Sequence, residues 1–294
     1  MIGIIGGTGL YFLDSLEDVR EIDVATPFGK PSDLITVGRF HGNDIAFLPR
    51  HGVGHRFLPT EVPYRANIWA FKYLGVNRIF SVSAVGSMRN DVRLSVPVIV
   101  DQMIDRTIHR QSTFFGNGLV AHVSMADPFC PSMRRLLLES AAQIGMEVVD
   151  GGAYVCIEGP QFSSRAESQW YRDIGSGSNH RDVRVNVIGM TNATEAKLAR
   201  EAEICYATIA LPTDYDCWHE EEDDVNCASV VERLQAGTTR ARELILAALR
   251  QIDAAGPCGC GDSLCHAFLT RRRLVPPRTL EMLAPITDRY FPKD

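Results

Sequence analysis

Short apolar runs rich in β-branched residues alternate along this chain with stretches of helical periodicity. Runs of that kind are typical of strands that are buried in a sheet. They lie at residues 2–5, 34–40, 44–49, 78–82, 96–100, 148–156, 185–188 and 206–211. Apolar positions at helical spacing predict helices over residues 65–74, 133–144, 164–173, 194–203 and 225–253. The alternation of strand and helix predicts an α/β fold with a mixed sheet.

The length of the chain suits one large domain. It has 294 residues, of which 45% are apolar, and about 250–300 residues is near the upper limit for a single core. Glycine and proline interrupt the last long helix at residues 254–261. We therefore expect one domain over residues 1–294, with residues 256–294 as a C-terminal appendage.

Charge and hydropathy exclude several classes of partner. The net charge is −6 and no extended basic stripe is present, which argues against nucleic-acid binding. No segment approaches the ~20 apolar residues of a membrane-spanning helix. The N-terminus has no basic region, and glycines interrupt its apolar run, so a signal peptide is not expected and the protein is predicted to be cytoplasmic.

The eight cysteines are too sparse for a disulfide scaffold. Five of them are isolated and are interpreted as buried free thiols: Cys130, Cys156, Cys205, Cys217 and Cys227. The other three, Cys258, Cys260 and Cys265, form a cluster that could hold zinc or a disulfide. Neither a C-x2-C pair nor a second ligand pair at finger spacing is present. We therefore expect no metal site.

Four strand ends carry residues that could bind an anion. They are Gly6-Gly7-Thr8-Gly9, Arg50-His51-Gly52, Ser83-Ala84-Val85-Gly86-Ser87, and Met190-Thr191 before the helix that holds Glu195. Glycine turns expose backbone N–H groups, and arginine offers a fork of donors. Each could also be an ordinary turn, and none matches a dinucleotide fingerprint or a P-loop. If the four ends converge, they form one oxyanion-binding crevice at an edge of the sheet.

Two carboxylates follow the last predicted strand. Asp214 and Asp216 are two residues apart, so in extended geometry their side chains point to the same side. Paired carboxylates raise one another's proton affinity, and one of them could then serve as a general acid towards a heterocycle nitrogen. The alternative is an ordinary acidic turn that runs on into the acidic residues 220–224.

Several longer stretches carry a resemblance to a known family. They are residues 3–9, 26–32, 50–52, 66–70, 157–168, 190–191 and 213–218, including Ile157-Glu158-Gly159-Pro160-Gln161-Phe162-Ser163 and Thr213-Asp214-Tyr215-Asp216-Cys217-Trp218. Together they resemble the methylthioadenosine phosphorylases within the trimeric purine nucleoside phosphorylase family. The likeness runs in register from residue 1 to about residue 250. Gln161 and Thr194 depart from the pattern, at positions where arginine and proline are usual.

This resemblance implies one α/β domain whose central mixed, partly barrelled sheet is flanked by helices. It implies a homotrimer, with a hexamer as an alternative, and an active site near a subunit interface. The implied reaction is the reversible phosphorolysis of methylthioadenosine to adenine and methylthioribose 1-phosphate, with no metal or organic cofactor and with phosphate as co-substrate.

The resemblance also assigns roles to individual residues. Phosphate would be bound by Thr8, Arg50, His51, Ser83, Ala84 and Thr191. The nucleoside would be bound by Phe162, Ile188, Met190, Thr213, Asp214 and Asp216, with Phe162 against the base and Met190 along the ribose. The two aspartates, as the catalytic pair, would face the purine N7 and 6-amino group. The apolar 5′ pocket would be lined by Cys227, Val230 and Val231, and by His122 of a neighbouring chain.

Other functions remain open on the sequence alone. A phosphorylase could act on methylthioinosine, inosine, guanosine or 5′-deoxyadenosine. Two aspartates accept hydrogen bonds from an amino group, which favours adenine over an oxopurine. A nucleosidase that uses water would have no need of the phosphate-binding residues. A non-catalytic nucleoside or phosphate sensor on the same fold is the alternative from another class.

Overall fold

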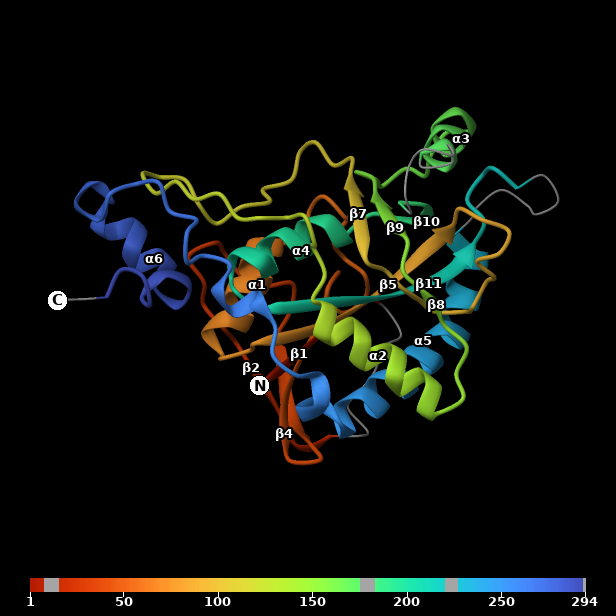
Figure 1. Cartoon of the computed structure of the whole chain (residues 1–294), viewed down its shortest axis with the longest axis horizontal. Coiled ribbons are helices and arrows are strands. Elements are labelled where there is room, and N and C mark those ends of the chain that lie inside the picture. Colours follow the sequence, from red (N-terminus) through yellow and green to blue (C-terminus); the bar gives the residue numbers. More distant parts are fainter. Residues whose placement is uncertain (8–15, 175–182, 220–226, 293–294) are drawn as a thin grey trace.

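The computed structural model describes residues 1–7, 16–174, 183–219 and 227–292, without the side chains of residues 227–232 and 234–236. The chain forms a single-domain α/β fold (Figure 1). The strands are β1 (Ile2–Gly6), β2 (Glu17–Ile22), β3 (Ile35–Phe40), β4 (Asn43–Pro49), β5 (Arg78–Ser87), β6 (Val98–Ile99), β7 (Gln102–Asp105), β8 (Val149–Asp150), β9 (Ala153–Cys156), β10 (Val185–Gly189) and β11 (Cys205–Asp214). The α-helices are α1 (Tyr64–Tyr73), α2 (Pro131–Gln143), α3 (Arg165–Asp173), α4 (Asn192–Glu201), α5 (Cys227–Arg250) and α6 (Pro277–Thr287).

The strands form one mixed sheet that branches at β5. The main path runs β2-β3-β4-β1-β5-β10-β9-β7, while β11 pairs with β5 and β6, and β6 pairs with β8. The pairs β1–β4, β1–β5 and β5–β11 are parallel, whereas β5–β10 and β3–β4 are antiparallel. The architecture expected from the sequence, a mixed and partly barrelled sheet with helices around it, is confirmed.

Helices cover both faces of the sheet, as Figure 1 shows for α1 and α4 on one side and α2 and α5 on the other. The alternation of side chains along β1 explains this arrangement. Ile5 packs in the same apolar cluster as residues of α1 and α4, whereas Ile4 packs with residues of α2 and α5. Because both faces of β1 are buried, its sequence is a continuous apolar run without a polar side.

Most predicted elements are present, with different bounds. The strand predicted over 78–82 continues to Ser87, so Ser83–Ser87 is strand and not a turn. The reason is that β10 and β11 both pair with this part of β5. The run predicted over 148–156 is split into β8 and β9 by Gly151 and Gly152, which have φ of 82° and 93°. β2, β7 and α6 were not predicted.

The C-terminal segment packs against the main part of the chain. The indole nitrogen of Trp69 in α1 donates to the carbonyl oxygen of Met282 in α6 at 3.0 Å. Leu283 and Ile286 are buried in the apolar cluster that contains Trp69. Residues 256–292 are therefore continuous with the core on the α1 face. Among the described residues, no helix combines the length and hydropathy that crossing a membrane requires.

Candidate active site

Three strands meet at Gly86, near the end of β5. Gly86 pairs with Ile188 of β10 on one side and with Asp214 of β11 on the other. A Cβ atom added to Gly86 would lie 2.9 Å from Asp214 Oδ1 and 3.0 Å from Ile188 Cγ2. Glycine is therefore needed here for the close approach of the neighbouring side chains. Of the four strand ends that the sequence predicted to converge, residues 83–87 are thus brought next to the last residues of β10 and β11.

The turn after β11 holds the two aspartates. The backbone N–H of Asp216 donates to Asp214 Oδ1 at 2.9 Å, and Thr213 Oγ1 donates to Asp214 Oδ2 at 2.8 Å. The strand ends at Asp214, and Asp216 lies in the turn that follows, where its φ is 52°. The extended geometry expected for this pair is therefore wrong. A turn brings the carboxylates together, and the main-chain N–H of one aspartate orients the other.

Both carboxyl groups have a raised proton affinity. Burial raises the pKa of Asp214 above its ordinary value. Burial, and to a smaller extent the charge of Asp214, raises the pKa of Asp216 to about 6. Asp216 Oδ2 is buried without a hydrogen-bond partner among the described residues. The pair can therefore hold a proton close to neutral pH and has an oxygen available for a ligand.

A buried ion pair lies beneath the strand ends. The guanidinium of Arg50 contacts the Glu195 carboxylate through Nε and through Nη2, the latter at 2.9 Å. Nη1 donates to the carbonyl oxygen of Val82, and Nη2 also donates to Ser81 Oγ. Although burial opposes charge, the Glu195 carboxylate raises the pKa of Arg50. Arg50 is thus a fixed cation with four of its five N–H groups engaged.

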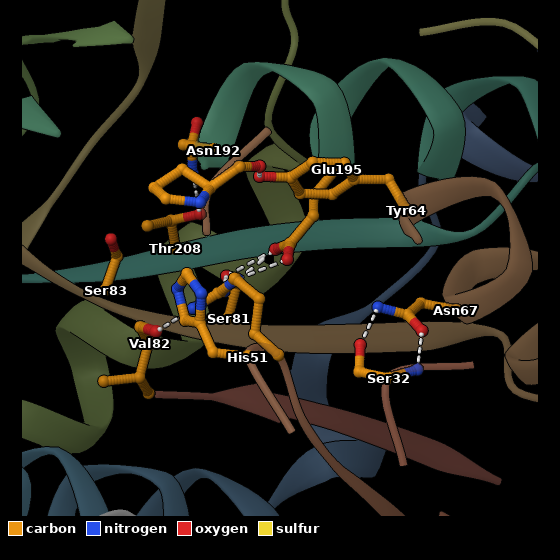
Figure 2. A network of polar contacts seen from close by, with 12 residues as sticks. Ser32, His51, Tyr64, Asn67, Ser81, Val82, Ser83, Asn192, Glu195 and Thr208 are labelled. Carbon is orange, nitrogen blue, oxygen red and sulfur yellow. Dashed lines mark hydrogen bonds and ion pairs between the residues drawn. The ribbon is translucent and has the colours of Figure 1, made fainter. Parts of the chain in front are cut away.

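Figure 2 shows how Glu195 reaches from α4 towards Ser81 on β5, with His51 and Ser83 nearby. Its Oε2 also accepts a hydrogen bond from the Tyr206 hydroxyl at 2.8 Å and from Ser81 Oγ at 3.0 Å. One carboxylate therefore ties together α4, β5, β11 and the end of β4. This role of Glu195 was not predicted from the sequence. A glutamate among alanines on the inner face of α4 was its signal, because a buried arginine needs a partner.

Polar groups that could bind an anion surround this pair. Ser83 Oγ lies 3.1 Å from the Tyr154 hydroxyl, and Ala84 after it is partly exposed. The Tyr154 hydroxyl lies directly over Gly189, where a Cβ would be 1.9 Å away. Thr191 Oγ1, at the N-terminus of α4, is buried with no hydrogen-bond partner among the described residues. An unpartnered buried hydroxyl at a helix N-terminus suits an anion.

His51 enters the site as a neutral ring. Burial and the charge of Arg50 lower the pKa of His51 to about 4. Its Nδ1 lies 2.8 Å from the carbonyl oxygen of Phe57, so Nδ1 carries the proton and donates. Nε2 is then an acceptor. The neutral ring can therefore accept a hydrogen bond from a P–OH group or a sugar hydroxyl.

Two of the side chains predicted to bind the nucleoside lie on or next to the segment from Gly159 to Ser163. Met190 packs over Gly159, whose Cβ position lies 2.5 Å from Met190 Sδ. Phe162 is 45% exposed, and the residue after it is held next to the aspartates because Cys217 Sγ donates to the Ser163 carbonyl oxygen at 3.2 Å. A half-exposed aromatic ring beside buried carboxylates is well suited to pack on a planar ligand.

Some predicted residues are not brought to this place. Thr8 lies outside the described residues, and the side chains of Cys227, Val230 and Val231 in α5 are not described. His122 is exposed, and its N–H donates to the Ala267 carbonyl oxygen in the C-terminal segment. Figure 1 shows the chain between β7 and α2 extending to α6 and returning, away from the ends of β5 and β11. Within one chain, His122 is therefore not part of the site.

The predicted cysteine cluster differs from the observed one. Cys265 is exposed and lies 3.6 Å from the Tyr290 hydroxyl. Cys258 and Cys260 instead meet Cys130 and Cys205, two of the thiols interpreted as isolated. Cys130, Cys205 and the Cys258–Cys260 pair are 53 or more positions apart in sequence, so the spacing rules for local ligand pairs do not detect the cluster.

Comparison with known proteins gives consistent results. Residues 1–250 match the sequence model of the phosphorylase superfamily. An S-methyl-5'-thioadenosine phosphorylase of Geobacter sulfurreducens is 51% identical over 99% of both chains. The enzyme of that name from Koribacter versatilis is 48% identical over 99% of this chain and 96% of the relative.

Solved structures show the same likeness. A methylthioadenosine phosphorylase from an antarctic soil metagenomic library superposes with a TM-score of 0.88 at 46% identity, over 97% of this chain and 98% of that one. A mutant adenosine/methylthioadenosine phosphorylase from Schistosoma mansoni, in complex with methylthioadenosine, has a TM-score of 0.78 at 36% identity, over 86% and 91% of the two chains.

Proposed function

The chain belongs to the phosphorylase superfamily and, within it, to the S-methyl-5'-thioadenosine phosphorylases, and we propose that the site around Gly86 carries out their reaction. The enzyme is a pentosyltransferase that converts S-methyl-5'-thioadenosine and phosphate reversibly to adenine and 5-methylthioribose 1-phosphate. The observation that carries this assignment is the position of both groups along β5: Ser81–Ser83 contact Arg50 and Tyr154, and Gly86 pairs with Asp214. We infer a role in purine and methionine salvage.

Phosphate would be bound on the side of Ser83, Ala84 and Thr191. Hydroxyl and main-chain donors of these residues suit the phosphate oxygens, and His51 Nε2 suits a P–OH group. Arg50 would contribute its one remaining N–H group and its positive charge to phosphate binding. Holding the nucleophile in place before reaction lowers the entropic part of the barrier. The phosphate charge would also stabilise the cationic sugar of the transition state.

The leaving adenine would be stabilised by the aspartate pair. Cleavage of the N-glycosidic bond builds positive charge on the sugar and negative charge on the base. Because burial raises the pKa of both Asp214 and Asp216, the pair can offer a proton to N7 while still accepting from the 6-amino group. General acid assistance of this kind is typically worth ~10²–10⁴-fold in rate. Attack by phosphate from the face opposite adenine inverts the anomeric centre.

Selectivity for the 6-amino group would come from the same residues. Thr213 Oγ1 and the Asp216 N–H both donate to Asp214, so Asp214 is fixed as an acceptor. A 6-oxopurine would place a carbonyl acceptor against that carboxylate, which is a mismatch. Met190 would lie along the ribose, Phe162 would pack on the base, and Ile188, beside Gly86, would line the apolar wall.

We further propose a homotrimer in which a neighbouring chain completes the 5′ pocket. His122 is exposed and lies on the segment between β7 and α2 that extends away from the domain. This position suits a contribution to another subunit's site. Light scattering of the purified protein would give the mass of the assembly, and a monomer with full activity would contradict the proposal.

The decisive experiment measures adenine release from S-methyl-5'-thioadenosine with and without phosphate, beside parallel reactions on inosine, methylthioinosine and 5′-deoxyadenosine. We expect phosphate-dependent adenine release and little base release from the oxopurine nucleosides. Asp214→Ala should lower turnover at least ~10²-fold, whereas Asp44→Ala, at an exposed position on β4, should not. Release without phosphate would contradict the proposal, because the protein would then be a nucleosidase.

A further inference from the structure

Four cysteine thiols meet at the end of the molecule opposite the proposed active site. They belong to Cys130, which precedes α2, to Cys205, the first residue of β11, and to Cys258 and Cys260 after α5. Their four sulfur atoms all lie within 4.8 Å of one another. Cys130 and Cys260 are buried, and the other two are partly exposed. Three separate segments of the chain therefore contribute thiols to one small volume.

Main-chain and side-chain hydrogen bonds hold these segments in place. The Cys130 N–H donates to the Tyr206 carbonyl oxygen at 2.8 Å, and the Cys205 N–H donates to the Asn77 carbonyl oxygen at 3.0 Å. Ser132 Oγ in α2 donates to the carbonyl oxygen of Pro257, next to Cys258, at 3.0 Å. The thiols are thus positioned by the backbone of β11 and α2, and their convergence does not depend on flexible side chains alone.

We propose that Cys130, Cys205, Cys258 and Cys260 bind one structural Zn²⁺ ion as a tetrathiolate. In a structural zinc site made of four cysteines the Zn–S distance is about 2.3 Å, which sets the edge of the sulfur tetrahedron at about 3.8 Å. The four sulfur atoms lie within 4.8 Å of one another, and small rotations of the side chains would bring them to the tetrahedral spacing. Four protein ligands leave no open position, so the ion would have a structural and not a catalytic role.

The alternative of paired disulfides fits this arrangement less well. Cys205 and Cys258 have their sulfur atoms 3.2 Å apart and all four cysteines are free thiols, whereas a disulfide requires about 2.05 Å. Each thiol is close to all three others and not to one partner. Four thiols that each lie near the other three favour a central ion over two covalent pairs.

Zinc binding has a defined proton balance. A tetrathiolate site binds the ion through four deprotonated sulfur atoms, so binding would release the thiol protons to solvent.

The location of the cluster defines what the ion would do. β11 begins at Cys205 and ends at Asp214, so nine residues of strand separate the metal from the aspartates by about 30 Å. Cys258 and Cys260 begin the segment that leads to α6, which follows α5 in Figure 1. The ion would therefore clamp this segment to α2 and β11, stabilising the fold without contacting the substrate.

Metal analysis of the intact protein tests the proposal. Protein expressed with zinc in the medium, then dialysed against a metal-free buffer, should contain about one zinc per chain by mass spectrometry. Replacement by Co²⁺ should give the absorption bands of a tetrahedral tetrathiolate. Cys260→Ser and Cys258→Ser should lose the metal and unfold at lower temperature. Cys265→Ser, which changes the exposed thiol outside the cluster, should keep both the metal and the unfolding temperature.

Three results would overturn the proposal. The first is metal-free protein whose four thiols all react with a thiol reagent in denaturant. The second is a mass and thiol count that show disulfides. The third is zinc that survives in the Cys258→Ser/Cys260→Ser double variant. These readouts do not use activity, so they are independent of the proposed function. Removal of zinc by a chelator should leave kcat at a permissive temperature unchanged within about twofold.

Discussion

At the level of single residues, some buried polar groups are hydrogen-bonded within the fold, whereas others have no partner and are available to a ligand. Thr208 and Thr191 illustrate the two cases, because both are buried. Thr208 Oγ1 accepts a hydrogen bond from Asn192 Nδ2 at 2.6 Å. Thr191 Oγ1 has no partner among the described residues. A buried hydroxyl without a partner, such as that of Thr191, does not stabilise the fold, and it gains a hydrogen bond only when a ligand binds.

This contrast predicts opposite effects for two matched substitutions. Thr191→Val should leave the unfolding temperature unchanged or slightly higher and should raise the KM for phosphate. Thr208→Val should destabilise the fold by about 1–3 kcal/mol, because the Asn192 donor is left unsatisfied. Phosphate-dependence assays and thermal denaturation of both variants measure these effects. An unchanged phosphate KM in Thr191→Val would remove Thr191 from the anion site.

The raised pKa of Asp216 predicts that this residue lowers the stability of the fold while it supports activity. Its folded pKa of about 6 lies above the ordinary value of about 3.9, so the folded state is destabilised when the carboxyl ionises. This penalty is absent below pH 4, grows as the pH rises from 4 to 6, and is constant above that. Asp216→Asn should therefore stabilise the free protein by up to about 3 kcal/mol above pH 6 and should lower turnover.

Thermal denaturation of Asp216→Asn and wild type at pH 5 and pH 8 checks the sign of this effect. The difference in unfolding temperature should be larger at pH 8. A variant that is less stable than wild type at both pH values would show that Asp216 makes a favourable native contact as a carboxylate.

At the scale of the element, the site depends on how closely strands can approach. β5 reaches its neighbours at Gly86, where an added Cβ would meet Asp214 Oδ1 and Ile188 at 2.9 and 3.0 Å. These distances are shorter than ordinary van der Waals contact. A side chain at this position must therefore displace Asp214 or move β10 away from β5, while the rest of the sheet keeps its pairing.

Gly86→Ala should accordingly lower kcat/KM about tenfold or more, which corresponds to about 1.4 kcal/mol of lost transition-state stabilisation. The matched control is Gly237→Ala in α5, whose Cβ would meet only Leu211 at an ordinary 3.4 Å. Alanine stabilises a helix by up to about 1 kcal/mol relative to glycine, so this control should be active and slightly more stable. Equal activities of the two variants would contradict the argument.

At the scale of the whole molecule, the C-terminal segment and the sheet domain share one core. Leu283 of α6 is fully buried in the cluster that contains Trp69 of α1, whereas Leu274 is 65% exposed. A shared core predicts a single cooperative unfolding transition. The segment after α5 is then part of the folding unit, although the superfamily model matches only residues 1–250.

Leu283→Ala should therefore lower the stability of the entire chain by about 2–5 kcal/mol, because a buried leucine leaves a cavity. Leu274→Ala should have almost no effect. Calorimetry of the two variants distinguishes the possibilities. A separate low-temperature transition in Leu283→Ala, with the main transition unchanged, would show that the C-terminal segment unfolds independently.

The α/β class and most strands and helices follow from the sequence alone, because hydrophobic periodicity and turn residues are local properties. The resemblance of residues 157–168 and 213–218 to the phosphorylases indicated the reaction before the fold was known. The comparisons confirmed it. The length of β5 was missed, because strand pairing with β10 and β11 overrode the small residues at its end.

Only the tertiary structure decided which distant residues meet. Arg50 and Glu195 are 145 positions apart, and the Cys130, Cys205, Cys258 and Cys260 thiols come from three segments. No local pattern encodes such contacts, because they arise from the order of strands in the sheet and from the packing of helices on it. For the same reason, the protonation of Asp216 and of His51 was set by burial, which is a property of the folded molecule.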